Sequence, residues 1–225
     1  MAEGEIVAIG GWPWEDAEMT QALQSYVLDH AAGRKICFVP TAVADSAEAT
    51  VTFYSLWRGR GELSHVEFFP WPAPDLRELV LDQDVVVVAG GNTANMLAIW
   101  RVHGFDRIVR EAWETGAVLT GWSAGMICWF EAGVTDSFGP QLEGMRDGLG
   151  LLAGSACPHY DGEERRRPVY TQLVADGFPP GIAADDGVAV RYAGTELAEV
   201  VTTRDGATAY RVEPSVETPL EARLL

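Results

Sequence analysis

The chain has 225 residues, of which 48% are hydrophobic, and its formal net charge at pH 7 is −17. A chain of this length fits one domain, so we expect residues 1–225 to form a single catalytic domain. Binding to phosphate groups needs clustered Lys and Arg, so this acidity argues against nucleic acid and anionic membranes as partners. No uninterrupted apolar stretch reaches about 18 residues, which predicts no membrane span and favours a cytoplasmic location.

Short apolar runs alternate with helical patterns through the first half of the chain, and the pattern of glycines and prolines separates them. The three cysteines show no C-x-x-C spacing, which predicts buried thiols rather than disulfides or a zinc site. The expected elements in this half are a strand over residues 5–9, a helix over 16–31, a strand over 35–39, a helix over 46–58 and a strand over 66–69.

The segment 84–89 is the clearest strand, because it is continuous and β-branched as buried parallel strands tend to be. Residues 90–93 then open a helix that extends to about residue 100, another helix spans roughly 105–115, and a strand covers 117–120. This β-α alternation predicts a mostly parallel sheet with helices on both faces. Beyond residue 149 the pattern changes to short strands, including 187–192 and 199–202, which we expect to extend the same sheet.

The sequence Gly-Trp-Ser-Ala-Gly at 121–125 lies between the expected strand 117–120 and the apolar run 126–130. A strand, a sharp turn flanked by glycines and then a helix is the context of a nucleophile elbow. The turn would project the hydroxyl of Ser123 from a helix N-terminus, where free N–H groups favour a developing negative charge. Ser123 is therefore the candidate nucleophile.

A serine hydroxyl needs a base, and the chain offers four histidines. His30 ends a helical pattern, where a cation suits the helix dipole, and His65 and His103 are expected to face solvent. His159 lies in the irregular segment 157–162, a position typical of site residues. We therefore predict that His159 is the base for Ser123.

A carboxylate should hold the imidazole in the correct tautomer. The residue pattern leaves four candidates open, namely Asp136, Asp161, Asp185 and Asp186. The chain order would then be Ser, His, Asp, whereas an α/β-hydrolase has the order Ser, acid, His.

Two backbone N–H groups are expected to form an oxyanion hole, one from Ala124 and the other from Gly91, which follows the strongest strand. The carboxyl ends of neighbouring parallel strands meet at one edge of a sheet, where ligands bind. Asn92 and Thr93 are candidates for binding the polar termini of a substrate. A phosphate-binding turn or a simple helix cap are the alternative interpretations of residues 90–93, although the patterns G-x-G-x-x-G and P-loop lysine are both absent.

Three motifs in this order and spacing resemble the peptidase E (aspartyl dipeptidase) family of serine peptidases, which also includes cyanophycinase. The motifs are Gly-Gly-Asn-Thr at 90–93, Gly-Trp-Ser-Ala-Gly at 121–125 and Pro-His-Tyr at 158–160. The resemblance covers nearly the whole chain. It implies a three-layer αβα sandwich with a mostly parallel sheet, related to class I glutamine amidotransferases, and a mechanism without a metal or organic cofactor.

The resemblance also implies the roles of individual residues. Ser123 would be the nucleophile and His159 the base, while Asp186 corresponds best to the third member, which is a glutamate in the family. Arg165 and Arg166 lie where the family binds a substrate carboxylate, which suits the bidentate geometry of arginine. A solvated helix face is the alternative interpretation of this charged run.

We therefore predict a serine exopeptidase acting on short peptides through an acyl-enzyme, with α-aspartyl dipeptidase as one specificity. The alternatives are a peptidase of this type without Asp preference, a cyanophycinase-like enzyme acting on β-linked Asp-Arg, a small-amide hydrolase and a non-catalytic binding platform. Four tryptophans could form a homodimer interface, the wall of an aromatic pocket or core: Trp12, Trp14, Trp57 and Trp71.

Overall fold

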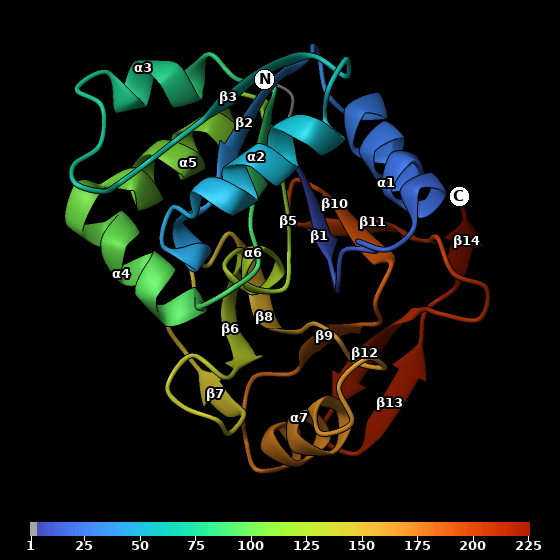
Figure 1. Ribbon diagram of the computed structural model, residues 1–225. Helices are drawn as coiled ribbons and strands as arrows, with labels where there is room; N and C mark the ends of the chain where they lie inside the picture. Colours follow the sequence, from blue (N-terminus) through green and yellow to red (C-terminus); the bar gives the residue numbers. More distant parts are fainter. Residues whose placement is uncertain (1–3) are drawn as a thin grey trace.

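The computed structural model describes residues 4–225, and within them eight strands form a large sheet (Figure 1). Five neighbouring strands of this sheet run parallel, and the remaining strands extend it beyond the first strand of the chain. The order across the sheet is β14 (Ala222–Leu224), β11 (Glu196–Thr202), β10 (Val188–Ala193), β1 (Glu5–Ile9), β5 (Val118–Trp122), β4 (Val85–Val88), β2 (Lys35–Val39) and β3 (Glu62–His65).

Helices cover both faces of the large sheet, which confirms the predicted three-layer arrangement. On one face, α1 (Ala17–Asp29) and α2 (Ala47–Leu56) pack their apolar side chains against alternate residues of β1, β2 and β4. On the other face lie α3 (Leu76–Leu81), α4 (Thr93–His103) and α5 (Phe105–Glu114). Strands β1, β2, β4 and β5 are buried on both sides, as their continuous apolar runs predict.

A second sheet lies beside the first, in the lower part of Figure 1, and α7 (Arg166–Ala175) packs against it. The expectation that the strands after residue 149 all extend one sheet is therefore only partly right. Strands β10, β11 and β14 do so, whereas others pair into the second sheet. Its order in the described residues is β13 (Val216–Pro219), β12 (Ala209–Glu213), β9 (Gly181–Ala184), β8 (Leu152–Cys157), β6 (Phe130–Thr135) and β7 (Glu143–Met145).

Side-chain caps explain why three helices begin where the sequence predicted. The carboxylate of Asp16 accepts hydrogen bonds from the N–H groups of Glu18 and Met19, both at 2.9 Å. In the same way, Ser46 caps α2 and Asn92 caps α4. Each cap satisfies N–H groups that have no partner inside the helix.

The strand expected over residues 66–69 is displaced. The structure places β3 earlier, at Glu62–His65, where it pairs with β2 at the edge of the sheet. Val66 and Phe68 are buried, but the N–H groups of Phe68 and Phe69 donate to the Asp45 carboxylate instead of a neighbouring strand. The apolar alternation in this segment therefore reflects packing against the core rather than sheet pairing.

The carboxyl ends of β1, β4 and β5 lie at one edge of the large sheet, because these strands run parallel and are linked through β5. The segments that leave this edge are 10–14, 90–92 and 123–124, so the topology alone brings three separate glycine- or serine-containing turns together. No helix in residues 4–225 combines the length and the apolar character that crossing a membrane requires.

Candidate active site

Ser123 occupies a strained turn between β5 and the short helix α6 (Ala124–Ile127). Its backbone has φ 56° and ψ −111°, a region that residues other than glycine rarely adopt. Such a conformation costs on the order of 1–3 kcal/mol and persists where the surrounding structure enforces it. The turn has the geometry of the predicted elbow.

The two glycines of the elbow let this turn pack directly against β4. A Cβ atom at Gly121 would lie 2.5 Å from the carbonyl oxygen of Val88, and one at Gly125 would overlap the same oxygen. Neither position has room for a side chain. The close backbone packing between β4, β5 and α6 therefore requires both glycines of the G-x-S-x-G pattern.

His159 follows β8 and forms a hydrogen bond with Asp186, with 2.6 Å between Nδ1 and Oδ1. An ionised carboxylate only accepts hydrogen bonds, so the proton lies on Nδ1 and Nε2 is left as an acceptor. This bond lowers the pKa of Asp186 below its ordinary value, and the charges of His159 and Arg204 lower it further. Burial of the carboxylate opposes this effect, because it raises the pKa. His159 also has positive φ, at 54°.

The loop that holds Asp186 is fixed by contacts that the sequence did not reveal. The N–H of Asp186 donates to Asp161 at 2.8 Å, and Arg204 donates both to Asp161 and to the carbonyl of Asp186. A Cβ atom at Gly11 or at Gly162 would overlap a carboxylate oxygen of Asp186. In the sequence, the double glycine at 10–11 was the one sign of this close packing around Asp186, but a double glycine by itself indicates only the end of a strand.

The other candidate carboxylates do not contact His159. Asp185 is buried and accepts a hydrogen bond from the N–H of Thr208 at 3.0 Å, and burial raises its pKa. Asp161 supports the Asp186 loop, while Asp136 is exposed after β6. Of the four carboxylates that the sequence left open, the structure pairs Asp186 with the imidazole.

The lowered pKa of Asp186 predicts a pH-dependent stability. Because its pKa in the folded protein lies below the unfolded value of about 3.9, ionised Asp186 stabilises the fold above about pH 4, and this contribution is lost as the pH falls through the folded pKa. Urea unfolding should therefore show that wild type loses stability relative to Asp186→Asn as the pH falls below about 4. The comparison with Asp185→Asn should give the opposite result: because the pKa of Asp185 is raised, wild type should gain stability relative to Asp185→Asn as the pH falls.

Gly11→Ala is expected to lower kcat by about 10- to 100-fold, because the new methyl group would displace the Asp186 carboxylate from His159. The matched control is Gly139→Ala, since a Cβ atom there would meet no atom within 4 Å. Steady-state kinetics on both variants, with circular dichroism to confirm folding, provide the measurement. Equal activity of the two variants would contradict the supporting role of Gly11.

Two backbone N–H groups near Ser123 are free to bind an oxyanion. Within residues 4–225, neither Gly91 nor Ala124 donates its N–H to another group of the protein. Gly91 has φ 133°, and Gly90 lies against Ser123, because a Cβ atom at Gly90 would be 3.2 Å from Cβ of Ser123. The oxyanion hole formed by Gly91 and Ala124 stays a prediction.

Asn92 and Thr93 are used within the fold. The Asn92 side chain caps α4 through its oxygen and donates through Nδ2 to the carbonyl of Ser137 at 3.0 Å. Thr93 is only 1% exposed. Neither residue lines the two cavities described below, and binding of the substrate termini by Asn92 and Thr93 stays a prediction.

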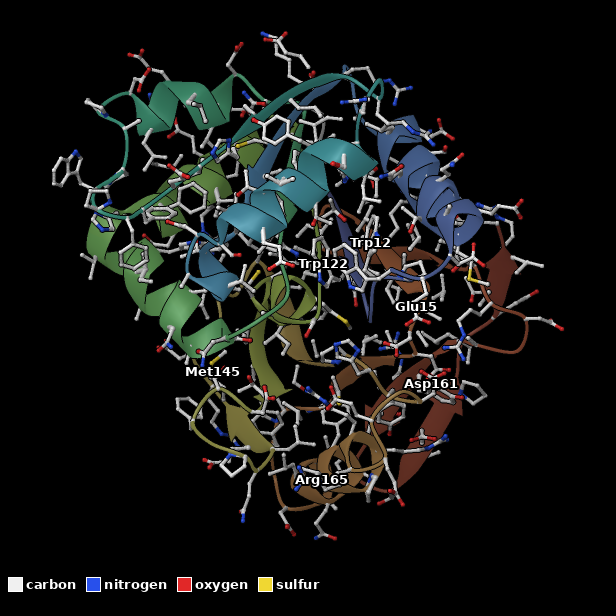
Figure 2. All side chains as sticks on the ribbon, viewed as in Figure 1. Trp12, Glu15, Trp122, Met145, Asp161 and Arg165 are labelled. Carbon is white, nitrogen blue, oxygen red and sulfur yellow. The ribbon has the colours of Figure 1, made fainter. Side chains whose placement is uncertain are left out.

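Arg165 and Arg166 also have partners within the fold. Arg165 is exposed and donates to the carbonyl of Pro140 at 3.0 Å, and Figure 2 shows it by α7 in the lower part of the view. Arg166 is 3% exposed, pairs with Glu163 at 2.8 Å and donates to the carbonyl of Val134 at 2.9 Å. Both guanidinium groups therefore stabilise the second sheet and its helix.

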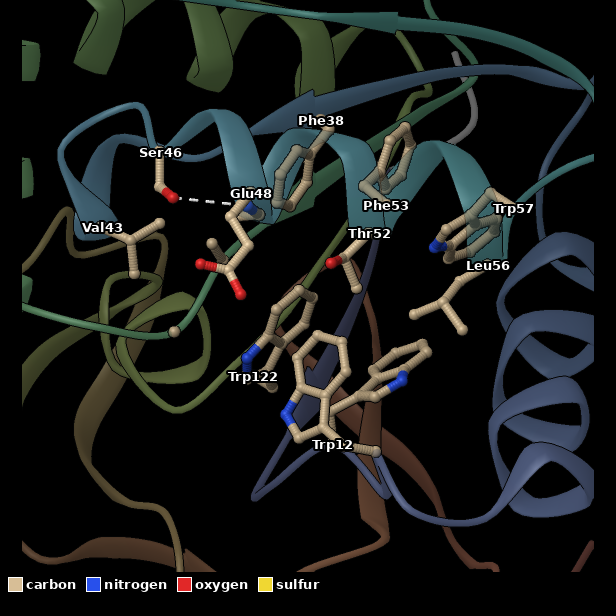
Figure 3. A pocket seen from close by; sticks show the side chains of 14 residues that line it. Trp12, Phe38, Val43, Ser46, Glu48, Thr52, Phe53, Leu56, Trp57 and Trp122 are labelled. Atoms are coloured by element: carbon tan, nitrogen blue, oxygen red, sulfur yellow. Dashed lines mark hydrogen bonds between the residues drawn. The ribbon is translucent and has the colours of Figure 1, made fainter.

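Two cavities flank the site. The first has a volume of about 310 Å³ and extends from Gly90 and Trp122 under α2 (Figure 3). The second has a volume of about 640 Å³ and is lined by His159, Asp186 and Arg204. Trp12 and Trp14 line both cavities. Of the four tryptophans singled out in the sequence, Trp12 and Trp57 are buried and Trp14 is half exposed. Trp71 is exposed and lies apart from the site.

Comparison with known proteins identifies the family. The model of peptidase family S51 matches residues 6–200. The chain belongs to peptidase family S51. It is therefore a serine peptidase, a hydrolase acting on peptide bonds.

Individual relatives agree with this assignment to family S51. The uncharacterized peptidase YgaJ of Bacillus subtilis is 45% identical over 212 residues, which cover 92% of this chain and 91% of YgaJ. Peptidase E of Shewanella denitrificans is 27% identical over 183 residues, with 77% of each chain covered. The crystal structure of a peptidase from an acI-B1 Actinobacterium has the same fold, with a TM-score of 0.69, 19% identity and coverage of 98% and 95%.

Proposed function

We propose that this serine peptidase is an exopeptidase that cleaves short peptides through Ser123, His159 and Asp186. The main support is the hydrogen bond between His159 and Asp186 at the sheet edge where Ser123 stands in its strained turn. Imidazole, carboxylate and hydroxyl come from three separate loops, and each loop is held by contacts that fix its backbone. The two cavities flank this site, an arrangement that suits one residue on each side of a scissile bond.

In this mechanism, Nε2 of His159 accepts the proton of Ser123 as Oγ attacks the scissile carbonyl carbon. The N–H groups of Gly91 and Ala124 bind the oxyanion that forms. The imidazolium, stabilised by Asp186, then donates its proton to the leaving amine, and an acyl-enzyme remains. Water enters, loses a proton to His159 and releases the acid as Ser123 recovers its hydrogen.

Among the specificities that the sequence left open, we favour a peptidase without Asp preference. An aspartyl dipeptidase needs a cation for the substrate side chain, yet Arg165 and Arg166 are engaged elsewhere. The cation among the residues that line the second cavity is Arg204, which already donates to Asp161 at 2.7 Å.

The test is hydrolysis of a dipeptide panel containing Asp-Leu, Ala-Leu, Glu-Leu and Trp-Leu by wild type and by Ser123→Ala. Cleavage that depends on Ser123 and does not favour Asp-Leu would support the proposal. Selective cleavage of Asp-Leu would establish the aspartyl specificity instead. Absence of any Ser123-dependent cleavage across the panel would overturn the exopeptidase function.

A further inference from the structure

We propose that the first cavity binds the side chain of the substrate residue whose carbonyl Ser123 attacks. This side chain is aromatic or large and aliphatic. The carboxylate of Glu48 binds the free α-ammonium group of the same residue. The proposal rests on the exopeptidase function given above and specifies its substrate class. It would make the protein a peptidase for short peptides with a bulky apolar N-terminal residue.

The position of the cavity assigns it to the acyl side of the scissile bond. It is lined by Gly90 and by Trp122, the residues directly before Gly91 and Ser123, so it opens beside the nucleophile and the oxyanion donors. The second cavity is lined by His159, which must reach the leaving amine to protonate it. The acyl residue therefore belongs in the first cavity and the leaving residue in the second.

The walls of the first cavity are aromatic. Six rings surround it, and several contact one another, with 5.3 Å between the ring centroids of Trp12 and Trp122 and 5.2 Å between those of Trp14 and Trp122. The volume of about 310 Å³ is enough for one large side chain. The rings that line it belong to Trp12, Trp14, Phe38, Phe53, Trp57 and Trp122 (Figure 3).

The polar side chains among the residues that line this cavity are Ser46, Glu48 and Thr52, and Figure 3 shows the Thr52 hydroxyl between Glu48 and Leu56. Figure 3 shows the carboxylate of Glu48 on the side of Val43 and Trp122, while Leu56 and Trp57 close the opposite end. The hydroxyl of Ser46 already caps α2. No ion pair within residues 4–225 uses Glu48.

An N-terminal amino acid has a matching distribution of charge. Its α-ammonium group is bonded to the carbon next to the scissile carbonyl, so it stays near the nucleophile while the side chain extends away. The cavity could therefore bury an apolar side chain among its aromatic rings while the carboxylate of Glu48 pairs with the α-ammonium group of the same residue. An aspartate side chain would instead place a second carboxylate among aromatic rings, where it has no cation to pair with.

The first experiment compares kcat/KM for Phe-Leu, Leu-Leu, Ala-Leu and Asp-Leu, with Ser123→Ala as the blank. We expect Phe-Leu to exceed Ala-Leu by about 10- to 100-fold, since burying a large apolar side chain has an effect of that order. A preference for Ala-Leu or Asp-Leu that depends on Ser123 would overturn the pocket assignment while leaving the exopeptidase function intact.

The second experiment fills the cavity. Thr52 lies on α2 and lines the cavity, so Thr52→Phe should lower kcat/KM for Phe-Leu by about 10- to 100-fold and change that for Ala-Leu by less than about threefold. The matched control is Val51→Phe, because the neighbouring Val51 is 65% exposed. Ala49→Leu is a second filling variant if Thr52→Phe fails to fold. Equal losses on both substrates would contradict the proposal.

The third experiment tests Glu48. Glu48→Gln should raise KM for Phe-Leu by about 10- to 100-fold, as expected for loss of a charge-assisted hydrogen bond, and should not affect acetyl-Phe-Leu, which has no ammonium group. The control is Glu18→Gln, since Glu18 occupies the same position in the first turn of α1 as Glu48 in α2. Equal effects on the free and acetylated peptides would exclude ammonium recognition.

A binding measurement separates this proposal from failure of the catalytic one. Phe-Leu and Ala-Leu are titrated into Ser123→Ala and followed by tryptophan fluorescence, because four of the cavity rings are indoles. Tighter binding of Phe-Leu that Thr52→Phe abolishes would support the pocket even if no peptide were hydrolysed. Equal affinity for both dipeptides, or no effect of Thr52→Phe, would overturn it.

Discussion

Replacing Ser123 with alanine is expected to lower kcat by about three to six orders of magnitude. The hydroxyl is the only part of the side chain that is removed, and the turn is held by backbone contacts, including the N–H of Ser123 donating to Ile9 at 3.2 Å. The fold should therefore remain intact. Initial rates on the dipeptide with the highest activity, together with circular dichroism of both proteins, provide the measurement.

A second variant at the same position serves as a control for backbone effects. Ser123→Gly removes the hydroxyl and also relieves the positive φ, so it should be as inactive as Ser123→Ala but more stable, by about 1 kcal/mol or more. Turnover of Ser123→Ala near the wild-type rate would show that Ser123 is not the nucleophile.

Asp186→Asn is expected to reduce kcat by about 10⁴-fold. The amide can turn its NH₂ group toward Nδ1 of His159, which would move the imidazole proton to Nε2 and prevent it from accepting the proton of Ser123. The adjacent Asp185→Asn is the matched control, because Asp185 bonds to Thr208 rather than to His159. Its activity should stay within about threefold of wild type.

The comparison of these two variants also resolves the choice that the sequence left open. Equal losses in Asp185→Asn and Asp186→Asn would mean that the loop as a whole, rather than the 2.6 Å hydrogen bond, determines activity. A kcat for Asp186→Asn within about tenfold of wild type would mean that His159 does not depend on this carboxylate for its tautomer.

Local sequence was sufficient for the central elements because their signals are short-range. Four consecutive valines predict the buried strand β4, and the glycines around Ser123 predict the turn after β5, since only glycine can approach the Val88 carbonyl so closely. Helix starts at Asp16 and Ser46 follow from capping within three residues. In each case the cause and the effect lie in the same segment.

Features that depend on partners far apart in sequence could not be predicted in this way. The short strands after residue 149 have similar patterns, and nothing local says which of two sheets each will join. Arg166 belongs to a charged run, which predicts exposure, but it is buried because it pairs with Glu163 and donates to the carbonyl of Val134. The aromatic cavity combines Trp12, Trp57 and Trp122 from three segments, so the tryptophans indicated aromatic surfaces but not their arrangement.

The position of β1 has a consequence for synthesis of the chain. Strand β1 precedes every other strand of the described residues, yet it lies inside the large sheet, between β5 and β10, where Glu5 is opposite Ala193 and Ile6 opposite Leu119. Until residues 188–193 have been translated, one edge of β1 has no partner, and Gly11 has no Asp186 to pack against. Vectorial folding can therefore build the helical layers first, but hydrolysis should be recovered only after residues 186–193 have emerged, and enzyme activity would report a late step in the folding of these residues.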